Sequence, residues 1–241
     1  MTGPRGARRC PAHHAPVRVF AAIFFAGLVF LGAGLPRGVL ADITLLQANG
    51  ESLKLSAPAR HIITLAPNLA ELVFAAGAAD RLQAVVEYSD FPAPVLQIPR
   101  IGNAFRIDIE RIIELKPDLV IAWKSGNPQT ALQKLEQLDI KVWQMEITRP
   151  EEIADAIENI SLAAGTQAHG HAVAQKLRNR LSALIQQNAG KTPVEFFYQI
   201  AARPLFTVNG QHIISRSMEI CGGRNVFADL QTLAPQVSRE S

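Results

Sequence analysis

The chain has 241 residues, of which 48% are hydrophobic, 19% charged and 6% aromatic, with 16 glycines and 15 prolines. This composition is typical of a folded protein and excludes a disordered, collagen-like or disulfide-dense chain. The formal net charge of +3 comes from five arginines in the first 41 residues, which hold no acid. The remaining residues carry 19 basic and 21 acidic side chains, a net charge of −2. No basic surface interleaved with aromatics is left to follow a phosphate backbone, so the sequence argues against nucleic-acid binding.

Residues 1–41 are predicted to be an export signal, so the mature protein is expected in the periplasm. Four of the arginines form its positively charged start, and an uncharged apolar run follows at residues 19–35. Val39 and Ala41 place small residues at the −3 and −1 positions of a cleavage before Asp42. The apolar run just reaches the lower limit of a spanning helix, so an uncleaved membrane anchor is the alternative.

From residue 42 the pattern predicts a β-hairpin followed by alternating strands and helices. Residues 43–55 alternate in hydrophobicity around Asn49-Gly50, a strong hairpin signal. Short apolar runs predict strands at residues 62–65, 82–86, 119–123 and 141–145. Helical spacing and caps, including a capping box from Thr148 to Glu151, predict helices at residues 69–76, 108–115, 127–138 and 148–164. Apolar strands separated by helices imply a parallel sheet covered on both faces, with ligand sites beyond its carboxyl edge.

A long helix is predicted over residues 166–189, with apolar residues at helical spacing and a length of about 33 Å. A second α/β unit follows, with a strand at residues 195–200 and a helix near residues 217–221. The predicted organisation is therefore a signal peptide, a first α/β lobe, a linker helix and a partial C-terminal α/β lobe, at residues 1–41, 42–165, 166–190 and 191–241.

The usual signatures of nucleotide binding and of hydrolases are absent from the sequence. His169 and His171 would diverge by about 200° on a helix, so no metal site is expected from them. Cys221 is the remaining cysteine once residues 1–41 are removed. A lone cysteine in an oxidising compartment is expected to be buried, to pair with another chain or to lack its partner, and burial is the default because nothing near Cys221 resembles a catalytic base.

Three aromatic residues are the candidate ligand contacts of the first lobe. Tyr88 follows a predicted strand directly, and Phe105 and Trp123 occupy loop or strand-end positions. Their convergence at the carboxyl edge would suit a large apolar ligand, whereas packing on their own lobe is the alternative. Glu110 and Glu219 each fall in the expected N-terminal half of a short helix, where acids usually compensate the helix dipole.

Five segments together resemble the cobalamin-binding branch of the periplasmic solute-binding proteins of ABC importers. The wider group also binds haem and ferric siderophores. The segments that carry the resemblance are residues 62–77, 88–92, 115–123, 218–227 and 235–240. The resemblance implies two α/β lobes joined by one rigid helix, with a corrinoid held between them. It also implies a monomeric, non-enzymatic protein for metal-chelate uptake, without a resident cofactor.

The resemblance further implies roles for individual residues. Tyr88 matches a ligand-contacting tyrosine, and Phe206 matches an aromatic residue of the second lobe. Glu110 and Glu219 match the pair of acids that docks onto arginines of the ABC permease in the inner membrane. Phe105 is expected to replace a ligand-side tryptophan of the family.

The family continues for some tens of residues beyond the position of Glu240, so the resemblance implies a C-terminally truncated chain with an incomplete second lobe. The cysteine that pairs with Cys221 would lie in that missing part. Haem or a ferric siderophore is the alternative ligand, with Tyr88 or His212 available to iron. An α/β metal-cofactor enzyme is a third, disfavoured hypothesis.

Overall fold

The computed structural model describes residues 42–239, and the predicted export signal lies outside these residues. A β-hairpin opens the described chain, with β1 (Ile43–Leu46) paired antiparallel to β2 (Ser52–Leu55). Gly50 in its turn has φ +89°, a backbone conformation that side-chain-bearing residues rarely adopt. The Trp143 indole N–H donates to the Leu46 carbonyl at 3.0 Å, so the hairpin is anchored to the sheet beside it. The hairpin prediction is confirmed.

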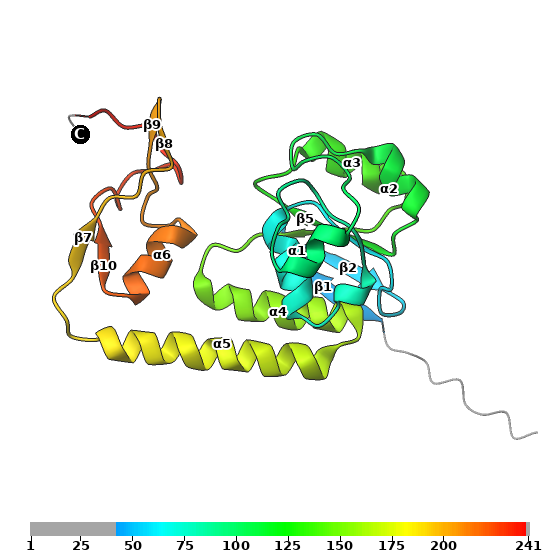
Figure 1. Cartoon of the computed structure of the whole chain (residues 1–241), viewed down its shortest axis with the longest axis horizontal. Helices are drawn as coiled ribbons and strands as arrows, with labels where there is room; N and C mark the ends of the chain where they lie inside the picture. Colours follow the sequence, from blue (N-terminus) through cyan, green and yellow to red (C-terminus); the bar gives the residue numbers. More distant parts are fainter. Residues whose placement is uncertain (1–41, 240–241) are drawn as a thin grey trace, which may run out of the picture. The chain divides into compact units, whose positions relative to one another are not determined.

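The next four strands form one parallel sheet in the order β4-β3-β5-β6. Figure 1 labels its strand β5. Because β3 lies between β4 and β5, the chain turns first to one side of β3 and then to the other. That reversal is a topological switch point, where α/β sheets bind ligands beyond the carboxyl ends of the strands. The strands are β3 (Ile62–Thr64), β4 (Leu82–Ala84), β5 (Leu119–Trp123) and β6 (Val142–Met145).

Helices cover both faces of this sheet, as the apolar strands predict. Successive strand residues point to opposite faces, so Ile62 packs with α1 and α4 while Ile63 packs with α2 and α3. The helical elements of this region are α1 (Pro67–Ala75), η1 (Ala79–Arg81), η2 (Ala93–Gln97), α2 (Ile109–Leu115), α3 (Gln129–Gln137) and α4 (Pro150–Ala164).

The start of α4 differs by one residue from the predicted capping box. Glu152, not Glu151, accepts hydrogen bonds from the backbone N–H groups of Thr148 (2.7 Å) and Arg149 (3.1 Å). Partial burial of Glu152 opposes ionisation, but these donors prevail and lower the pKa of its carboxyl. The capping residue is Glu152 because Pro150 is the first residue of the helix, which makes Glu152 the third.

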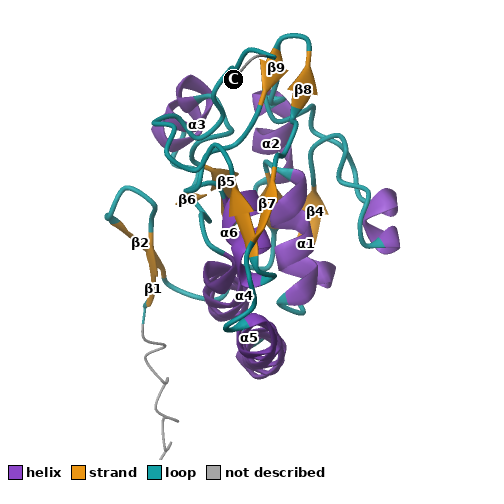
Figure 2. Cartoon of the chain, turned by 90° about the vertical axis from the view of Figure 1, so that its left-hand side faces the viewer, coloured by secondary structure: helices purple, strands orange, loops and turns teal. Residues whose placement is uncertain are grey.

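α5 (Gln167–Asn188) has 22 residues and packs along α4, with the two helices side by side in Figure 2. Gly170 permits the close approach, since a Cβ there would lie 2.2 Å from the Ser161 Cβ. Arg178 then bridges the helices through Asp155 and Glu158, each at 2.6 Å. The predicted linker helix is therefore fastened to the first region along its N-terminal half.

Within residues 189–239, the structure contains one helix and four short strands (Figure 1). A two-stranded parallel sheet pairs β7 (Val194–Phe196) with β10 (Gly223–Asn225), and β8 (Ala201–Ala202) pairs antiparallel with β9 (Leu205–Phe206). The expected strand at residues 195–200 is thus shorter than predicted.

The helix of this region, α6 (Ile213–Ile220), begins four residues before the predicted start near Ser217. Its N-terminus is set by His212, whose Nδ1 accepts from the Ile214 N–H at 3.2 Å. Cys221 directly follows α6 and is exposed, so the prediction of a buried thiol is wrong. Within residues 42–239, no helix combines the length and apolar character needed to cross a membrane.

Candidate functional site

Hydrogen bonds bring the loops at the carboxyl edge of the four-stranded sheet together. Glu87, just beyond β4, donates its N–H to the Gly102 carbonyl at 2.7 Å. The Asn127 amide, beyond β5, donates to the carbonyls of Leu65 (2.8 Å) and Ala104 (3.1 Å). Segments that follow β3, β4 and β5 are therefore neighbours, as expected where parallel strands end on one edge.

Tyr88 lies on the first of these loops with 82% of its surface exposed. Its φ of 66° is unusual for a bulky residue and must be imposed by the surrounding structure. The Arg100 guanidinium provides that support, because it donates to the carbonyl oxygens of Ser89 (2.8 Å) and Ile98 (2.7 Å). The Tyr88 ring is thus presented to solvent from a braced turn.

Phe105 is presented in a similar way, with 78% of its surface exposed. The Asn103 side chain accepts from the N–H groups of Phe105 (3.0 Å) and Arg106 (2.8 Å) and so closes the turn beneath the ring. Gly102 precedes this turn with φ +88°, and a Cβ there would lie 2.1 Å from the Arg106 carbonyl oxygen. A glycine is therefore required where the chain doubles back.

Trp123 differs from these two residues because it is half-buried at the end of β5. Its ring borders a largely apolar cavity of about 220 Å³. Within residues 42–239, no ring contact joins Tyr88, Phe105 and Trp123. The cavity is lined by Asn68, Glu71, Leu72, Trp123, Ile147, Ile153 and Ile213.

Sequence reasoning missed the contribution of Ile213 to this cavity. Ile213 is the first residue of α6, yet it packs against the hydrophobic core of the first region. Its contact partners are distant in sequence, so no local periodicity signals the contact. Phe206 lies on β9 and is half-buried, and its carbonyl accepts from the Ile200 N–H at 2.9 Å. The structure gives Phe206 no ring contact with the three aromatics of the first region.

The two predicted docking acids occupy different environments. Glu110 is exposed in the first turn of α2, and within residues 42–239 its side chain has no hydrogen bond or ion pair. Glu219 lies in the last turn of α6, not in its N-terminal half as predicted, because the helix starts at Ile213. Its carboxylate pairs with Arg216 at 3.2 Å and borders a cavity of about 620 Å³ beside the end of α5.

The two histidines of α5 serve separate contacts. The His171 Nδ1 lies 2.8 Å from the Glu158 carboxylate, whereas the His169 ring lies against Gly77. Hydrogen bonds from Arg178, and less strongly from His171, lower the pKa of Glu158 from its usual value near 4.5 to about 2, although burial opposes the shift. Among residues 42–239, His, Cys, Asp and Glu side chains nowhere gather in threes that could hold a metal ion.

Comparison with known proteins identifies relatives over most of the chain. A family model described as periplasmic binding protein matches residues 62–241. The vitamin B12-binding protein of Vibrio cholerae serotype O1 is 43% identical over 183 residues, which cover 76% of this chain and 66% of that protein. The crystal structure of the periplasmic vitamin B12 binding protein BtuF of Vibrio cholerae matches with a TM-score of 0.71 and 43% identity, covering 76% of this chain and 72% of that one.

The structure of a periplasmic heme binding protein from Pseudomonas aeruginosa matches with a TM-score of 0.66 and 20% identity, covering 76% of this chain and 67% of that one. At this identity the match shows a common fold and nothing further. The chain spans 66% of the length of the Vibrio relative, slightly less than two thirds. The predicted α/β class, with a parallel sheet and the fold of this protein group, is confirmed. Because the family model covers about three quarters of the sequence, the chain belongs to the family of periplasmic binding proteins.

Proposed function

We propose that this protein captures cobalamin and presents it to an ABC permease of the inner membrane, without catalysing a reaction. The mature protein would act as a monomer in the periplasm after cleavage near Ala41 and Asp42. The 43% identity to a vitamin B12-binding protein supports the choice of a corrinoid. Membership of the periplasmic binding proteins supports the compartment.

The observation that carries this proposal is the placement of Tyr88 and Phe105 on braced turns at the carboxyl edge of the sheet. Two aromatic rings with 82% and 78% of their surface exposed leave apolar area in water, and a ligand that covers this area gains binding free energy. Their turns are held by Arg100 and Asn103, so little conformational entropy is lost when a ligand packs on them. A large, rigid ligand with apolar faces fits such a surface.

The proposed ligand lies between a first lobe at residues 42–165 and a second lobe at residues 191–241, joined by the linker helix at residues 166–190. Trp123 would contribute from the first lobe and Phe206 from the second. The cavity that Trp123 shares with Ile213 supports this arrangement, since it already joins side chains from both sides of α5.

Titration with cyanocobalamin, followed by its absorbance and by calorimetry, tests the proposal. Tyr88→Ala should weaken binding by about 1–3 kcal/mol, through lost stacking and lost burial. Leu46→Ala is a matched control, because Leu46 is an exposed apolar residue on the hairpin (70% exposed) and should leave binding unchanged. Equal affinity of the Tyr88→Ala variant and the unmodified protein would remove Tyr88 from the site.

Haem is the second candidate ligand, because the exposed Tyr88 phenol could bind iron. His212 is poorly suited, since its Nδ1 already accepts from the Ile214 N–H, which places the proton of the neutral ring on Nε2. Burial lowers the pKa of His212 and favours that neutral form. Tyr88→Phe separates the two ligands: it keeps the ring for a corrinoid and removes the oxygen that iron requires. Haem binding that is abolished by Tyr88→Phe, with no cobalamin binding, would establish the alternative.

Docking to the permease is assigned to Glu110 and Glu219. Glu110 is the stronger candidate because its carboxylate is exposed and engages no other described residue, whereas Glu219 pairs with Arg216. Glu110→Lys should reduce cobalamin transport in intact cells more than Glu219→Lys does, because like charges at an interface repel. Both variants should keep their cobalamin affinity, and Glu51→Lys in the hairpin turn serves as the charge-reversal control. Normal transport by the double variant would exclude this docking role.

A further inference from the structure

Residues 123–127, at the end of β5 and in the loop that follows, make several side-chain hydrogen bonds. Asn127 is 5% exposed, and its side-chain amide makes three hydrogen bonds. Its Oδ1 accepts from the Trp123 N–H at 2.7 Å, and its Nδ2 donates to the carbonyls of Leu65 and Ala104. One amide therefore connects the ends of β3 and β5 to the turn that carries Phe105. Aspartate could replace the acceptor but neither donor.

A second chain of hydrogen bonds holds the Trp123 ring itself. The indole N–H donates to the Ser125 Oγ at 2.9 Å, and the Ser125 hydroxyl donates to the Glu146 Oε1 at 3.0 Å. Glu146 follows β6, and its Oε2 also accepts from the Ser125 N–H at 2.9 Å. The carboxylate thus fixes Ser125 through backbone and side chain, and Ser125 fixes the indole.

Two consequences follow for the surface that Trp123 offers to a ligand. Gly126 lies against the ring, since a Cβ there would be 2.8 Å from the Trp123 Cδ1, so the ring is closely packed on that side. The indole N–H, the one polar group of the ring, is already bonded to Ser125. Trp123 therefore presents hydrocarbon in a fixed orientation to the cavity that it borders.

We propose that Ser125, Glu146 and Asn127 are positioning residues of the ligand site, which hold Trp123 in one orientation and keep its N–H away from the ligand. The inference rests on the proposed function, in which Trp123 contacts the corrinoid. A fixed aromatic surface loses less freedom on binding than a mobile one, so these residues raise affinity without touching the ligand. Because these hydrogen bonds join the segments that follow β3, β5 and β6, three strands together fix the position of the Trp123 ring.

Fluorine NMR of the full chain labelled with 5-fluorotryptophan tests the proposal directly. The sequence contains two tryptophans, and Trp143 is buried in the core, so its signal reports on the fold while Trp123 reports on the site. Ser125→Ala should shift or broaden the Trp123 signal, leave the Trp143 signal unchanged, and weaken cyanocobalamin binding by about 2- to 10-fold. Ser125→Thr keeps the hydroxyl and should restore both properties.

Controls separate failure of this inference from failure of the proposed function. Ser182→Ala on the exposed side of α5 should change neither signal nor affinity. Asn127→Asp should perturb the Trp123 signal more than Ser125→Ala, because two carbonyls lose their donor. An unchanged Trp123 signal in Ser125→Ala overturns the positioning role whatever the ligand, and so does a changed signal with unchanged cobalamin affinity. Absence of cobalamin binding by the unmodified protein instead refutes the proposed function, and the inference with it.

Discussion

The regions before and after α5 bury different kinds of side chain. In residues 42–165 the buried residues are predominantly hydrophobic and fill both faces of the four-stranded sheet. In residues 191–239 Val208 is the buried hydrophobic residue, and it is accompanied by four buried polar residues. These are Thr207, Asn209, Ser215 and Asn225. The first region thus relies on removal of apolar surface from water, and the second on satisfied hydrogen bonds.

The polar residues of the second region form a connected network. Asn225 donates to the Val208 carbonyl and to the Ser215 Oγ, both at 2.8 Å. Ser215 in turn donates to the Asn209 carbonyl at 2.7 Å, and the Asn209 amide donates to the Leu230 carbonyl at 2.8 Å. Strand β10, helix α6 and the neighbouring loops are joined in this way.

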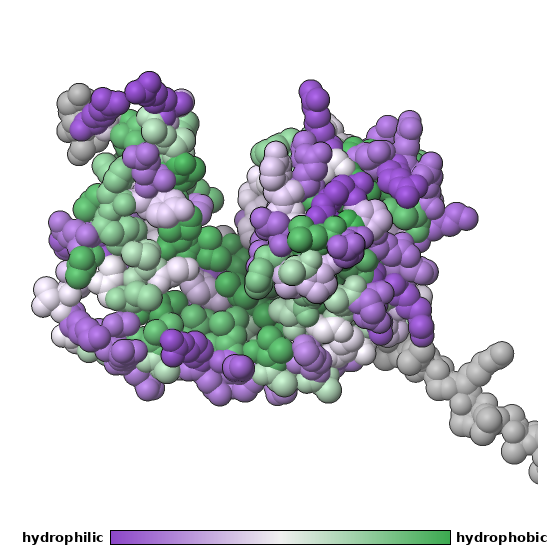
Figure 3. Space-filling view, in the orientation of Figure 1, coloured by the Kyte–Doolittle hydropathy of each residue, from purple (hydrophilic) through white to green (hydrophobic). Residues whose placement is uncertain are grey.

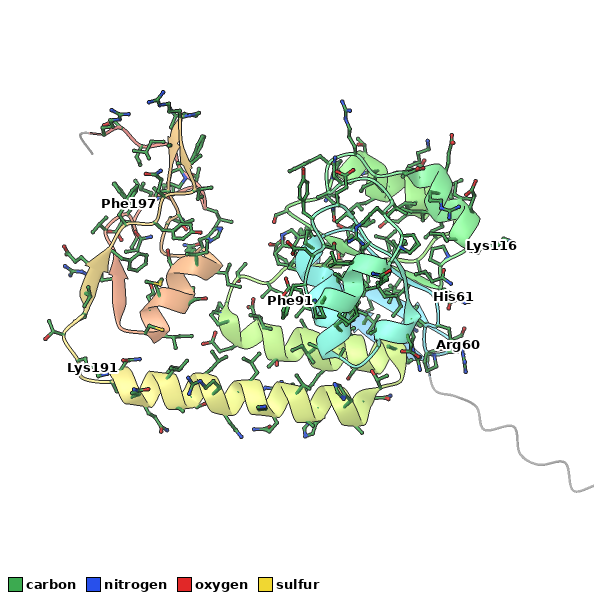
Figure 4. All side chains as sticks on the ribbon, viewed as in Figure 1. Arg60, His61, Phe91, Lys116, Lys191 and Phe197 are labelled. Carbon is green, nitrogen blue, oxygen red and sulfur yellow. The ribbon has the colours of Figure 1, made fainter. Side chains whose placement is uncertain are left out.

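Hydrophobic side chains of the second region lie largely at its surface, where Figure 3 shows green residues. Val194 and Val226 are 71% and 51% exposed. Figure 4 places Phe197 in this region, beyond Lys191 at the end of α5, and its ring meets Phe227 edge-on at 5.7 Å. Hydrogen bonds specify geometry but add little net free energy each, so this region should be the less stable of the two.

The largest effect is expected from a cavity in the first region. Ile121 is fully buried at the centre of β5, so Ile121→Ala should reduce the free energy of unfolding by about 2–5 kcal/mol. Val194→Ala shortens an exposed side chain and should change the free energy of unfolding by less than about 0.5 kcal/mol. Urea titration followed by far-ultraviolet circular dichroism measures the free energy of unfolding of both variants. A similar loss of unfolding free energy in the two variants would contradict the conclusion that buried apolar side chains stabilise the first region more than the second.

A smaller, local effect is expected from the polar network. Asn225→Ala leaves the Val208 carbonyl and the Ser215 hydroxyl without the donor that Asn225 provides. This should lower the free energy of unfolding by about 1–3 kcal/mol. Amide hydrogen exchange should quicken at residues 194–239 and stay unchanged at residues 62–164. Asn159→Ala, at an exposed position of α4, is the control. Uniform acceleration across both regions would show that they unfold as one unit.

The contact between α4 and α5 should respond to acid. Because the folded-state pKa of Glu158 is depressed to about 2, its stabilisation is complete above its usual pKa near 4.5 and is lost as the pH falls towards 2. The Glu158 side chain is about one-third exposed, so solvent screens its ion pairs. We therefore expect it to contribute about 1 kcal/mol to the free energy of unfolding. Glu158→Gln should remove this part of the pH dependence measured by urea titration between pH 4.5 and 2. A curve parallel to that of the unmodified protein would exclude the Glu158 contribution.

The sequence predicted the first region well because its signals are local. Apolar runs located all four strands of the sheet, and Asn49-Gly50 located the hairpin turn. The helix predicted from residue 108 is confirmed as α2, which Asp108 caps by accepting from the Arg111 N–H at 2.9 Å. The exposed aromatics Tyr88 and Phe105 could be placed for the same reason, since each follows a recognisable strand or turn.

The second region was predicted less well because its contacts are long-range and polar. Burial of Asn225 depends on partners 10 and 17 residues away, which no hydrophobic period reveals. The exposure of Cys221 follows from its place just after α6, and the helix begins earlier than its composition suggests because His212 caps it. The bonds that fix Trp123 were equally hidden, since Glu146 lies 21 residues from Ser125.

The smallest effect is expected at the surface of the same small sheet. Arg224 and Glu195 are register partners on β10 and β7 and form an ion pair, but their side chains are 68% and 60% exposed. Arg224→Ala should therefore lower the free energy of unfolding by less than about 1 kcal/mol. Added salt should abolish this difference between the variant and the unmodified protein, because exposed charges are screened within about 8 Å at physiological ionic strength. Arg224 adjoins the buried Asn225, so the two alanine variants compare the surface and the interior of one strand by urea titration with and without 0.5 M salt. If Arg224→Ala cost as much as Asn225→Ala, surface charge would stabilise the second region in place of the buried amide network.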